Sequence, residues 1–162
     1  MTSFLAHDRL PVTDMIEATG NDLPNLHQWL PLLRESLAQQ GRFRWQLRGA
    51  SMLPTLPPDS EIEIEPPPSR IPLGTLVVFA GSASLVVHRL VHRAPPFLVT
   101  QGDNRREPDR WLRSDQVLGV VVSAHCDGRC IWPGALEPAL RWRWIGRARG
   151  LWLLRRLKRI VT

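Results

Sequence analysis

Three short segments of the chain carry side chains that together could perform nucleophilic catalysis. Ser51 lies in Gly-Ala-Ser-Met-Leu-Pro-Thr, and His88 lies in Val-Val-His-Arg-Leu. Asp103 belongs to Gln-Gly-Asp-Asn, and Asp109 follows it six residues later. A serine hydroxyl is a weak nucleophile near neutral pH, so it needs a base that accepts its proton. The base in turn needs a carboxylate that orients its ring and stabilises the imidazolium. These segments therefore contain the components of a base-activated serine.

Two histidines compete for the role of the base. His88 and His92 are four residues apart in a segment that is expected to be a strand, so we expect both side chains on one face. The strand rise separates them by roughly 13 Å, and only one of them can then serve Ser51. The spacing does not choose between them. Non-catalytic explanations also exist, because Ser51 could be a turn residue, His88 a half-buried histidine, and the segment 103–104 ordinary turn chemistry.

The elements that must position these residues are short strands. Phe43, Trp45 and Leu47 alternate with polar residues, and residues 61–65 alternate again as Glu-Ile-Glu-Ile-Glu. This alternation is typical of half-buried strands. Further strands, separated by turn signals, are predicted at residues 75–80, 84–93, 97–101 and 117–123. Residues 42–125 are therefore expected to form a mainly β body, either a small barrel or a coiled sheet.

A helix is expected before the β body. Leucines recur at helical spacing within residues 25–40, and Gly41 is a residue type that commonly follows a helix C-terminus. Pro31 fits best in a first turn, so we expect the helix to begin near it. The predicted division of the chain is an N-terminal extension with one helix (1–41), a β domain that carries the candidate residues (42–125), a linker (126–140) and a basic amphipathic tail (141–162).

The formal net charge of +6 originates in the tail. Residues 141–162 contain eight basic and no acidic residues, whereas residues 1–140 contain 13 basic and 15 acidic ones, a net charge of −2. On a helix the leucines and the basic residues of the tail fall on opposite faces, which is typical of an interfacial helix that binds anionic lipid. Packing of this helix on the body or on a second copy is the alternative. Nucleic-acid binding is disfavoured, because no base-reading motif accompanies the arginines.

In their order along the chain, the motifs resemble the conserved boxes of type I signal peptidases, which are serine peptidases of the S24/S26-like group. Residues 49–55 resemble the nucleophile box, and residues 101–104 resemble the Lys-Gly-Asp-Asn box. Residues 71–79 resemble the strand box, with Thr75 where the family usually has Asp. The resemblance covers about residues 42–123. It implies a serine endopeptidase that removes a leader or signal peptide from a precursor protein, cleaves after small residues, binds its substrate as an extended strand against a sheet edge, and requires no metal or cofactor.

The identity of the base distinguishes the branches of that family. The bacterial enzymes pair the serine with a lysine, but here His88 occupies the matching position and the single lysine of the chain, Lys158, lies in the tail. A histidine at this position resembles the archaeal and endoplasmic-reticulum branch, and the resemblance favours His88 over His92. In that branch an aspartate after the Gly-Asp-Asn box completes a triad, and Asp109 matches it. Asp103 is the second candidate, and we expect it to support the turn.

Three departures from the family, of which Thr75 in the strand box is one, leave a second interpretation open. Gly49 stands where some members use a side-chain hydroxyl as an oxyanion donor, so backbone donors such as the Ser51 N–H must serve. Residues 25–40 are too polar to span a membrane, and we expect a cytoplasmic or peripherally membrane-associated protein with neither a signal peptide nor a transmembrane helix. The alternative to an enzyme is a non-catalytic module that binds peptides or partners on a degenerate peptidase fold.

Two cysteines lie near the end of the predicted β body. Cys126 and Cys130 flank a short turn next to His125. Three soft ligands are one short of a closed zinc site. The favoured interpretation is therefore a turn with two thiols or a small disulfide loop, without a metal.

Overall fold

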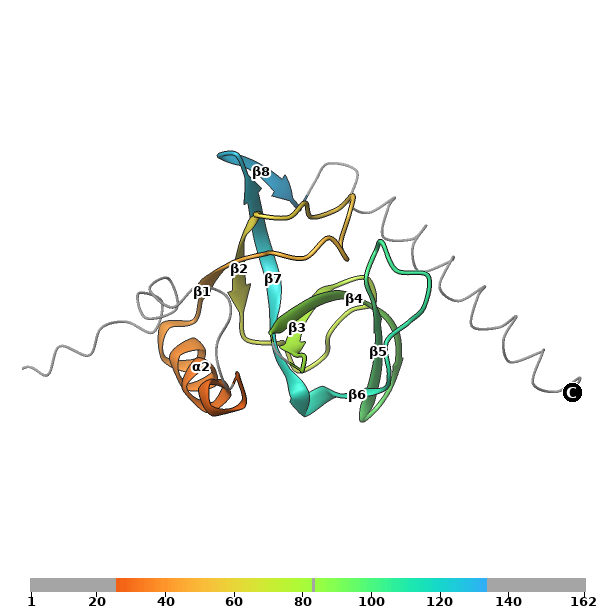
Figure 1. Ribbon diagram of the computed structural model, residues 1–162. Coiled ribbons are helices and arrows are strands. Elements are labelled where there is room, and N and C mark those ends of the chain that lie inside the picture. The colour runs from red at the N-terminus through yellow and green to blue at the C-terminus, as the bar shows by residue number, and fades with distance from the viewer. Residues whose placement is uncertain (1–25, 83, 134–162) are drawn as a thin grey trace, which may run out of the picture.

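The structure is a computed structural model that describes residues 26–82 and 84–133. It confirms the prediction of a mainly β protein with a helix before the sheet. In chain order the elements are α2 (Leu26–Gln40), β1 (Phe43–Gln46), β2 (Glu61–Glu65), β3 (Leu76–Ala80), β4 (Leu85–Ala94), β5 (Phe97–Gln101), β6 (Leu112–Arg113), the 3₁₀ helix η1 (Ser114–Gln116), β7 (Val117–Cys126) and β8 (Arg129–Trp132) (Figure 1).

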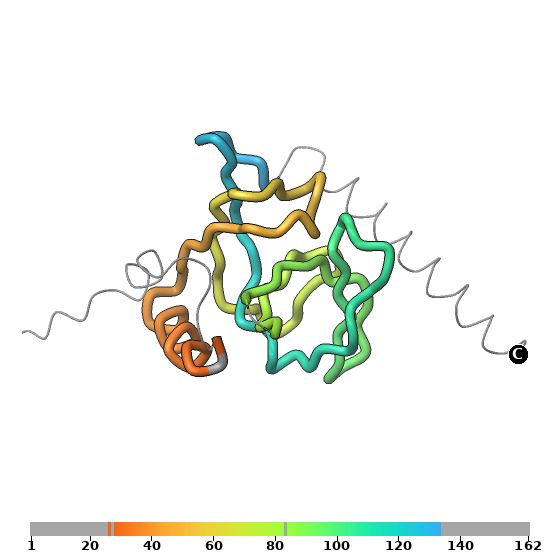
Figure 2. Tube along the Cα trace, in the orientation of Figure 1, coloured from red at the N-terminus to blue at the C-terminus, as the bar shows by residue number. Residues whose placement is uncertain are grey.

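The strands form a single antiparallel sheet that curls into a half-barrel. Their order is β1-β2-β7-β3-β4-β5-β6, and β8 pairs with β7 at one end. Figure 2 shows β3 to β6 turning back on themselves, while β1 and β2 extend from the other side of β7. The long strand β7, which pairs with β2 on one side and with β3 on the other, therefore connects the open part of the sheet to its curled part.

Alternating burial explains why the first strands could be predicted. Phe43 and Trp45 of β1 are buried while Arg44 is exposed. On the outer face, the Arg42 guanidinium lies 2.8 Å from the Glu65 carboxylate across the β1–β2 pair. A strand with one solvent-exposed face and one buried face alternates polar and apolar residues along its sequence. The strands β6 and β8 are too short to leave such a pattern, and neither was predicted.

Two clusters of apolar side chains fill the two sides of the sheet. One lies between α2 and the sheet and includes Leu33, Leu37 and Ile64. The other lies within the curl and includes Leu90 and Leu98. The curl thus has an interior face of its own, and the candidate catalytic residues described below lie at one end of it.

The prediction that the helix begins near Pro31 is wrong. The helix α2 begins at Leu26, so Pro31 lies inside it and removes one main-chain donor. Burial of apolar side chains on one face of the helix, among them Leu33 and Leu37, outweighs this loss. The predicted end of the helix is confirmed, because Gly41 has a φ of 74° and its N–H donates to the Leu37 carbonyl at 2.9 Å.

The C-terminal predictions fall partly outside the described residues. The basic tail (141–162) lies there, together with most of the linker (126–140). Residues 126–132 continue the sheet, because Cys126 ends β7 and β8 returns along it as a hairpin. Among the described residues no helix is both long enough and apolar enough to cross a bilayer.

Candidate active site

The nucleophile candidate lies in a turn that is anchored to the core on its C-terminal side. Ser51 follows β1 and an irregular segment, and the next residue, Met52, is fully buried. The N–H of Leu56, another fully buried residue, donates to the Met52 carbonyl at 2.9 Å. Two buried apolar side chains therefore hold the turn in place while Ser51 remains partly exposed.

The base candidate lies in the middle of a central strand. His88 of β4 pairs with Val77 of β3, and only 6% of the residue is exposed. Its Nε2 lies 3.1 Å from the Ser51 Oγ. The Phe79 ring contacts the imidazole edge-on, with 6.1 Å between the ring centroids. Strand pairing and this aromatic contact together fix the position of the ring.

Asp109 contacts the other nitrogen of the same ring. The His88 Nδ1 lies 2.6 Å from the Asp109 Oδ2, and the histidine side chain is 7% exposed against 29% for the aspartate. A carboxylate accepts hydrogen bonds but has no proton to donate, so this bond places the ring proton of His88 on Nδ1. The Nε2 lone pair of His88 then faces the Ser51 hydroxyl and can accept its proton.

A residue that was not predicted holds the carboxylate. Thr100 of β5 is fully buried, and its Oγ1 donates to the Asp109 Oδ2 at 2.6 Å. The Asp109 N–H donates to the Thr100 carbonyl at 2.8 Å. One residue therefore fixes both the main chain and the carboxylate of Asp109. Threonines are common in strands, so the sequence gives no sign of this role.

Asp103, the second carboxylate candidate, binds a different residue, Arg89. Both of its oxygens bind the Arg89 guanidinium, with Nε–Oδ1 at 2.8 Å and Nη2–Oδ2 at 2.6 Å. Arg89 and Asp103 are 1% and 5% exposed, and Thr55 of the nucleophile turn donates to Asp103 at 2.5 Å. Arg89 also donates to the Gly74 carbonyl at 3.0 Å. Asp103 thus connects three chain segments around the site, while Asp109 is the carboxylate that contacts His88.

Two neighbours of Asp103 complete the packing around the serine. The main-chain N–H of Asn104 donates to the Ser51 carbonyl at 2.8 Å, and its side-chain Nδ2 donates to the Ala50 carbonyl at 3.2 Å. A Cβ placed on Gly102 would lie 2.7 Å from the Ser51 carbonyl oxygen and 2.9 Å from the His88 Nε2. Only glycine allows the chain to pass so close to both groups. The sequence contains this segment as a motif but does not specify these contacts.

The prediction that His92 shares the face of His88 is wrong. The β4–β5 register shifts between Leu90 and His92, so that Leu90 is opposite Thr100 and His92 is opposite Val99. Successive residues of β5 point to opposite faces, and the extra residue in β4 therefore turns His92 to the outer face. There it contacts the exposed Trp111, with 5.9 Å between the ring centroids.

The cysteine pair is separate from this site. Cys126 and Cys130 are free thiols in the β7–β8 hairpin. Cys130 is opposite His125 and Cys126 is opposite Arg129, so the two thiols belong to opposite faces of the hairpin. Within residues 26–82 and 84–133, no group of three or more His, Cys, Asp or Glu side chains could hold a metal ion.

The fold and the site together define an antiparallel β body that carries a hydrogen-bonded Ser-His-Asp arrangement. No protein-family model matches the chain, and no curated protein matches it. The chemistry of the arrangement is therefore inferred from its geometry.

Proposed function

We propose that the chain is a serine endopeptidase of signal-peptidase type. In this proposal Ser51 is the nucleophile, His88 the general base and Asp109 the orienting carboxylate. The observation that carries it is the continuous series Ser51 Oγ–His88 Nε2 (3.1 Å) and His88 Nδ1–Asp109 Oδ2 (2.6 Å). Three segments that are far apart in the sequence supply these groups in the order that base-activated attack requires.

The first half of the reaction forms an ester on the serine. The Ser51 Oγ attacks the scissile carbonyl carbon while its proton passes to the His88 Nε2. Asp109 stabilises the resulting imidazolium through the Nδ1–H bond without taking the proton itself. His88 then gives the proton to the leaving amine as the C–N bond breaks. In the second half, a water molecule attacks the ester carbon while His88 takes its proton. His88 then returns that proton to the Ser51 Oγ as the bond between the acyl carbon and Oγ breaks, which releases the new carboxyl terminus.

The negative charge on the tetrahedral intermediate needs donors that are already oriented. The Ser51 N–H is the first candidate, because it lies beside the nucleophile. The peptide bond is planar, so the Ala50 carbonyl and the Ser51 N–H point in opposite directions. Two donors bind that carbonyl, the Asn104 Nδ2 at 3.2 Å and the Leu53 N–H at 3.3 Å, and together they fix the direction of the Ser51 N–H. In some members of the family that the sequence resembles, a side-chain hydroxyl at the position of Gly49 has this role. Here the backbone donor takes it.

The proposal is tested with the purified full-length chain and internally quenched peptides that carry Ala at positions −3 and −1 of a single cleavage site. Mass spectrometry then identifies the cleaved bond. We expect cleavage after the −1 Ala, loss of cleavage in Ser51→Ala and His88→Ala, and retention in His92→Ala. Thermal unfolding of each variant establishes that it is folded. Wild-type cleavage by Ser51→Ala would overturn the proposal.

The same peptides separate the enzyme from the non-catalytic alternative, a peptide-binding module on a degenerate peptidase fold. Such a module binds the peptides without cleaving them in any variant. The proposed physiological substrate is a precursor protein with a leader or signal peptide. Association with an anionic membrane through residues 141–162 remains a prediction, which is tested by vesicle sedimentation with and without that segment.

A further inference from the structure

The loop between β5 and β6 brings an arginine side chain to the edge of the candidate active site. This loop lies beside the nucleophile turn, since the Asn104 N–H donates to the Ser51 carbonyl at 2.8 Å (Figure 1). A Cβ placed on Gly102 would lie 2.9 Å from the Arg105 Cγ and 2.9 Å from the His88 Nε2. Both atoms therefore border the same small space. The aliphatic part of the Arg105 side chain lies next to the nitrogen that is proposed to accept the serine proton.

The main chain of Arg105 is held in place. Its N–H donates to the Gly102 carbonyl at 2.9 Å, and its carbonyl accepts a bond from the Gln101 Nε2 at 2.8 Å. Gln101 directly follows Thr100, the buried residue that binds Asp109. The start of the Arg105 side chain is therefore fixed relative to the proposed catalytic residues, and only its outer end can adjust to a ligand.

The charge of Arg105 is not neutralised by the part of the protein that the structure describes. The residue is exposed, and no carboxylate within residues 26–82 and 84–133 forms an ion pair with it. The two carboxylates of the site have other partners, because Asp103 lies 2.6 Å from Arg89 and Asp109 lies 2.6 Å from His88. A positive charge that is held beside a reaction centre attracts an anionic group of the substrate.

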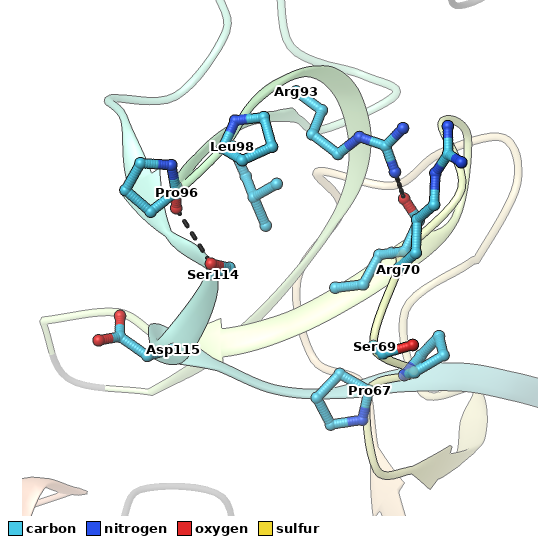
Figure 3. Close-up of a pocket in the computed structure, with 11 residues that line it drawn as sticks. Pro67, Ser69, Arg70, Arg93, Pro96, Leu98, Ser114 and Asp115 are labelled. Atoms are coloured by element: carbon cyan, nitrogen blue, oxygen red, sulfur yellow. Dashed lines mark hydrogen bonds between the residues drawn. The ribbon is translucent and has the colours of Figure 1, made fainter.

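Other arginines of the curled part of the sheet differ in this respect. Arg113 forms an ion pair with Asp115 at 3.1 Å. Arg93 lines an open pocket of about 730 Å³, where its Nη1 donates to the Ile71 carbonyl at 3.0 Å (Figure 3). None of the proposed catalytic residues lines that pocket. Arg105 differs from both arginines, because it lies beside the reaction centre and has no partner in the described structure.

The proposed reaction determines which part of a substrate lies nearest to Arg105. His88 donates a proton from Nε2 to the leaving amine, so the nitrogen of the first residue after the cleaved bond (position +1) must come within hydrogen-bond distance of Nε2. The side chain at +1 begins two bonds from that nitrogen. In an extended peptide the side chain at +2 points the opposite way. The +1 side chain is therefore the one that a guanidinium beside Nε2 can bind.

We propose that Arg105 is a specificity residue that binds a carboxylate side chain at +1 of the substrate. A guanidinium can donate two parallel N–H bonds to one carboxylate, which adds geometric selectivity to the attraction between the charges. The enzyme should therefore prefer precursors with Glu or Asp directly after the cleaved bond. This inference rests on the proposed endopeptidase function and adds to it a preference on the leaving side of the substrate.

The test compares quenched peptides that differ only at +1, with Glu or with its isosteric amide Gln. We expect the full-length chain to cleave the Glu peptide with a kcat/KM about fivefold higher, as one exposed ion pair provides. This ratio should fall to about one in Arg105→Gln, and Arg105→Glu should instead prefer Lys over Gln at +1. Equal cleavage of both peptides by the wild type overturns the inference and leaves the Ser51 proposal intact. An equal loss for both peptides in Arg105→Gln also overturns it, because Arg105 would then stabilise the oxyanion.

Matched controls locate the effect. Arg106→Gln removes the same charge from the next exposed residue and should keep the ratio, whereas an equal fall of the ratio would indicate general attraction by the loop and contradict the assignment. Peptides with Glu or Gln at +2 should be cleaved equally, and a preference at +2 alone would also contradict it.

Binding to full-length Ser51→Ala, followed by fluorescence anisotropy of labelled peptides, gives a measurement that does not require cleavage. We expect tighter binding of the peptide with Glu at +1 than of the Gln peptide, and loss of this difference when Arg105→Gln is added. If the wild type cleaves neither peptide, the endopeptidase proposal fails, and this difference in binding would still support the carboxylate site at Arg105. Equal binding of both peptides would then overturn the carboxylate site as well.

Discussion

Thr100 holds Asp109 from two directions. Its hydroxyl donates to the Asp109 Oδ2 at 2.6 Å, and its carbonyl accepts the Asp109 N–H at 2.8 Å. The oxygen that receives the hydroxyl is the one that binds the His88 Nδ1. The orientation of the imidazole therefore depends on a buried threonine that never reaches the substrate, and Thr100 is a positioning residue in the proposed mechanism.

Replacement of Thr100 tests this role. Thr100→Val keeps the shape of the side chain but removes the donor, so Asp109 loses one of its two anchors. We expect kcat to fall about tenfold, the equivalent of one ordinary hydrogen bond, with little change in KM. Thr100→Ser restores the hydroxyl and should recover most of the activity. The measurement is steady-state kinetics on the quenched peptide, and an unchanged kcat in Thr100→Val would contradict the assignment.

Gly102 has no space for a side chain. A Cβ there would lie 2.7 Å from the Ser51 carbonyl oxygen and 2.9 Å from the His88 Nε2, so Gly102→Ala must displace the Ser51 main chain, the His88 ring or both. We expect at least about a hundredfold loss of kcat/KM, as misplacement by about 1 Å produces. Gly49→Ala is the matched control, because a Cβ at Gly49 meets nothing within 4 Å. Equal activity of the two variants would refute the steric explanation.

Asn104 is expected to act through the peptide between Ala50 and Ser51. Asn104→Ala removes the 3.2 Å side-chain bond to the Ala50 carbonyl and retains the main-chain bond to the Ser51 carbonyl. The Ala50 carbonyl then keeps the bond from the Leu53 N–H at 3.3 Å but loses the one from Asn104, so the Ser51 N–H is held less firmly, and we expect kcat to fall about tenfold. Because the oxyanion forms only in the transition state, KM should change little. A rise in KM at constant kcat would instead assign Asn104 to substrate binding.

The strands that could be predicted from the sequence are those with one solvent-exposed face and one buried face. Phe43 and Trp45 alternate with exposed arginines because β1 is covered on a single side. The segment from Val87 to Val91 of β4 is buried at every position, so its pattern does not reveal which residues share a face. A single-residue register shift could not be detected there, and His92 was assigned to the wrong face.

Some residues of the candidate site could likewise be predicted from the sequence, and others could not. Ser51, His88 and Asp109 are residue types that can serve as nucleophile, base and carboxylate, so they could be selected from the sequence and the resemblance. Thr100 and Arg89 could not, because their roles arise from contacts between distant segments. The start of α2 was misplaced for a related reason, since tertiary burial of leucines overrides the local preference of Pro31.

The buried Arg89–Asp103 pair should contribute to stability only while it is complete. Both residues are almost fully buried, and Arg89 also lies 5.4 Å from the centre of the Trp132 ring. Asp103→Ala leaves a guanidinium without its carboxylate in the interior, and we expect the free energy of unfolding to fall by about 3–5 kcal/mol. Arg89→Met combined with Asp103→Leu removes both charges, and its free energy of unfolding should fall less than that of Asp103→Ala.

Urea unfolding followed by tryptophan fluorescence measures both variants. The control is Arg113→Met, which breaks an exposed ion pair with Asp115 and should change the unfolding midpoint little.

The same variants separate stability from catalysis. Below its unfolding transition, the double variant should keep the Ser51–His88–Asp109 contacts but lose the link from Thr55 to Arg89 and Asp103. A double variant less stable than Asp103→Ala would show that the charges themselves, rather than their pairing, hold the three segments together.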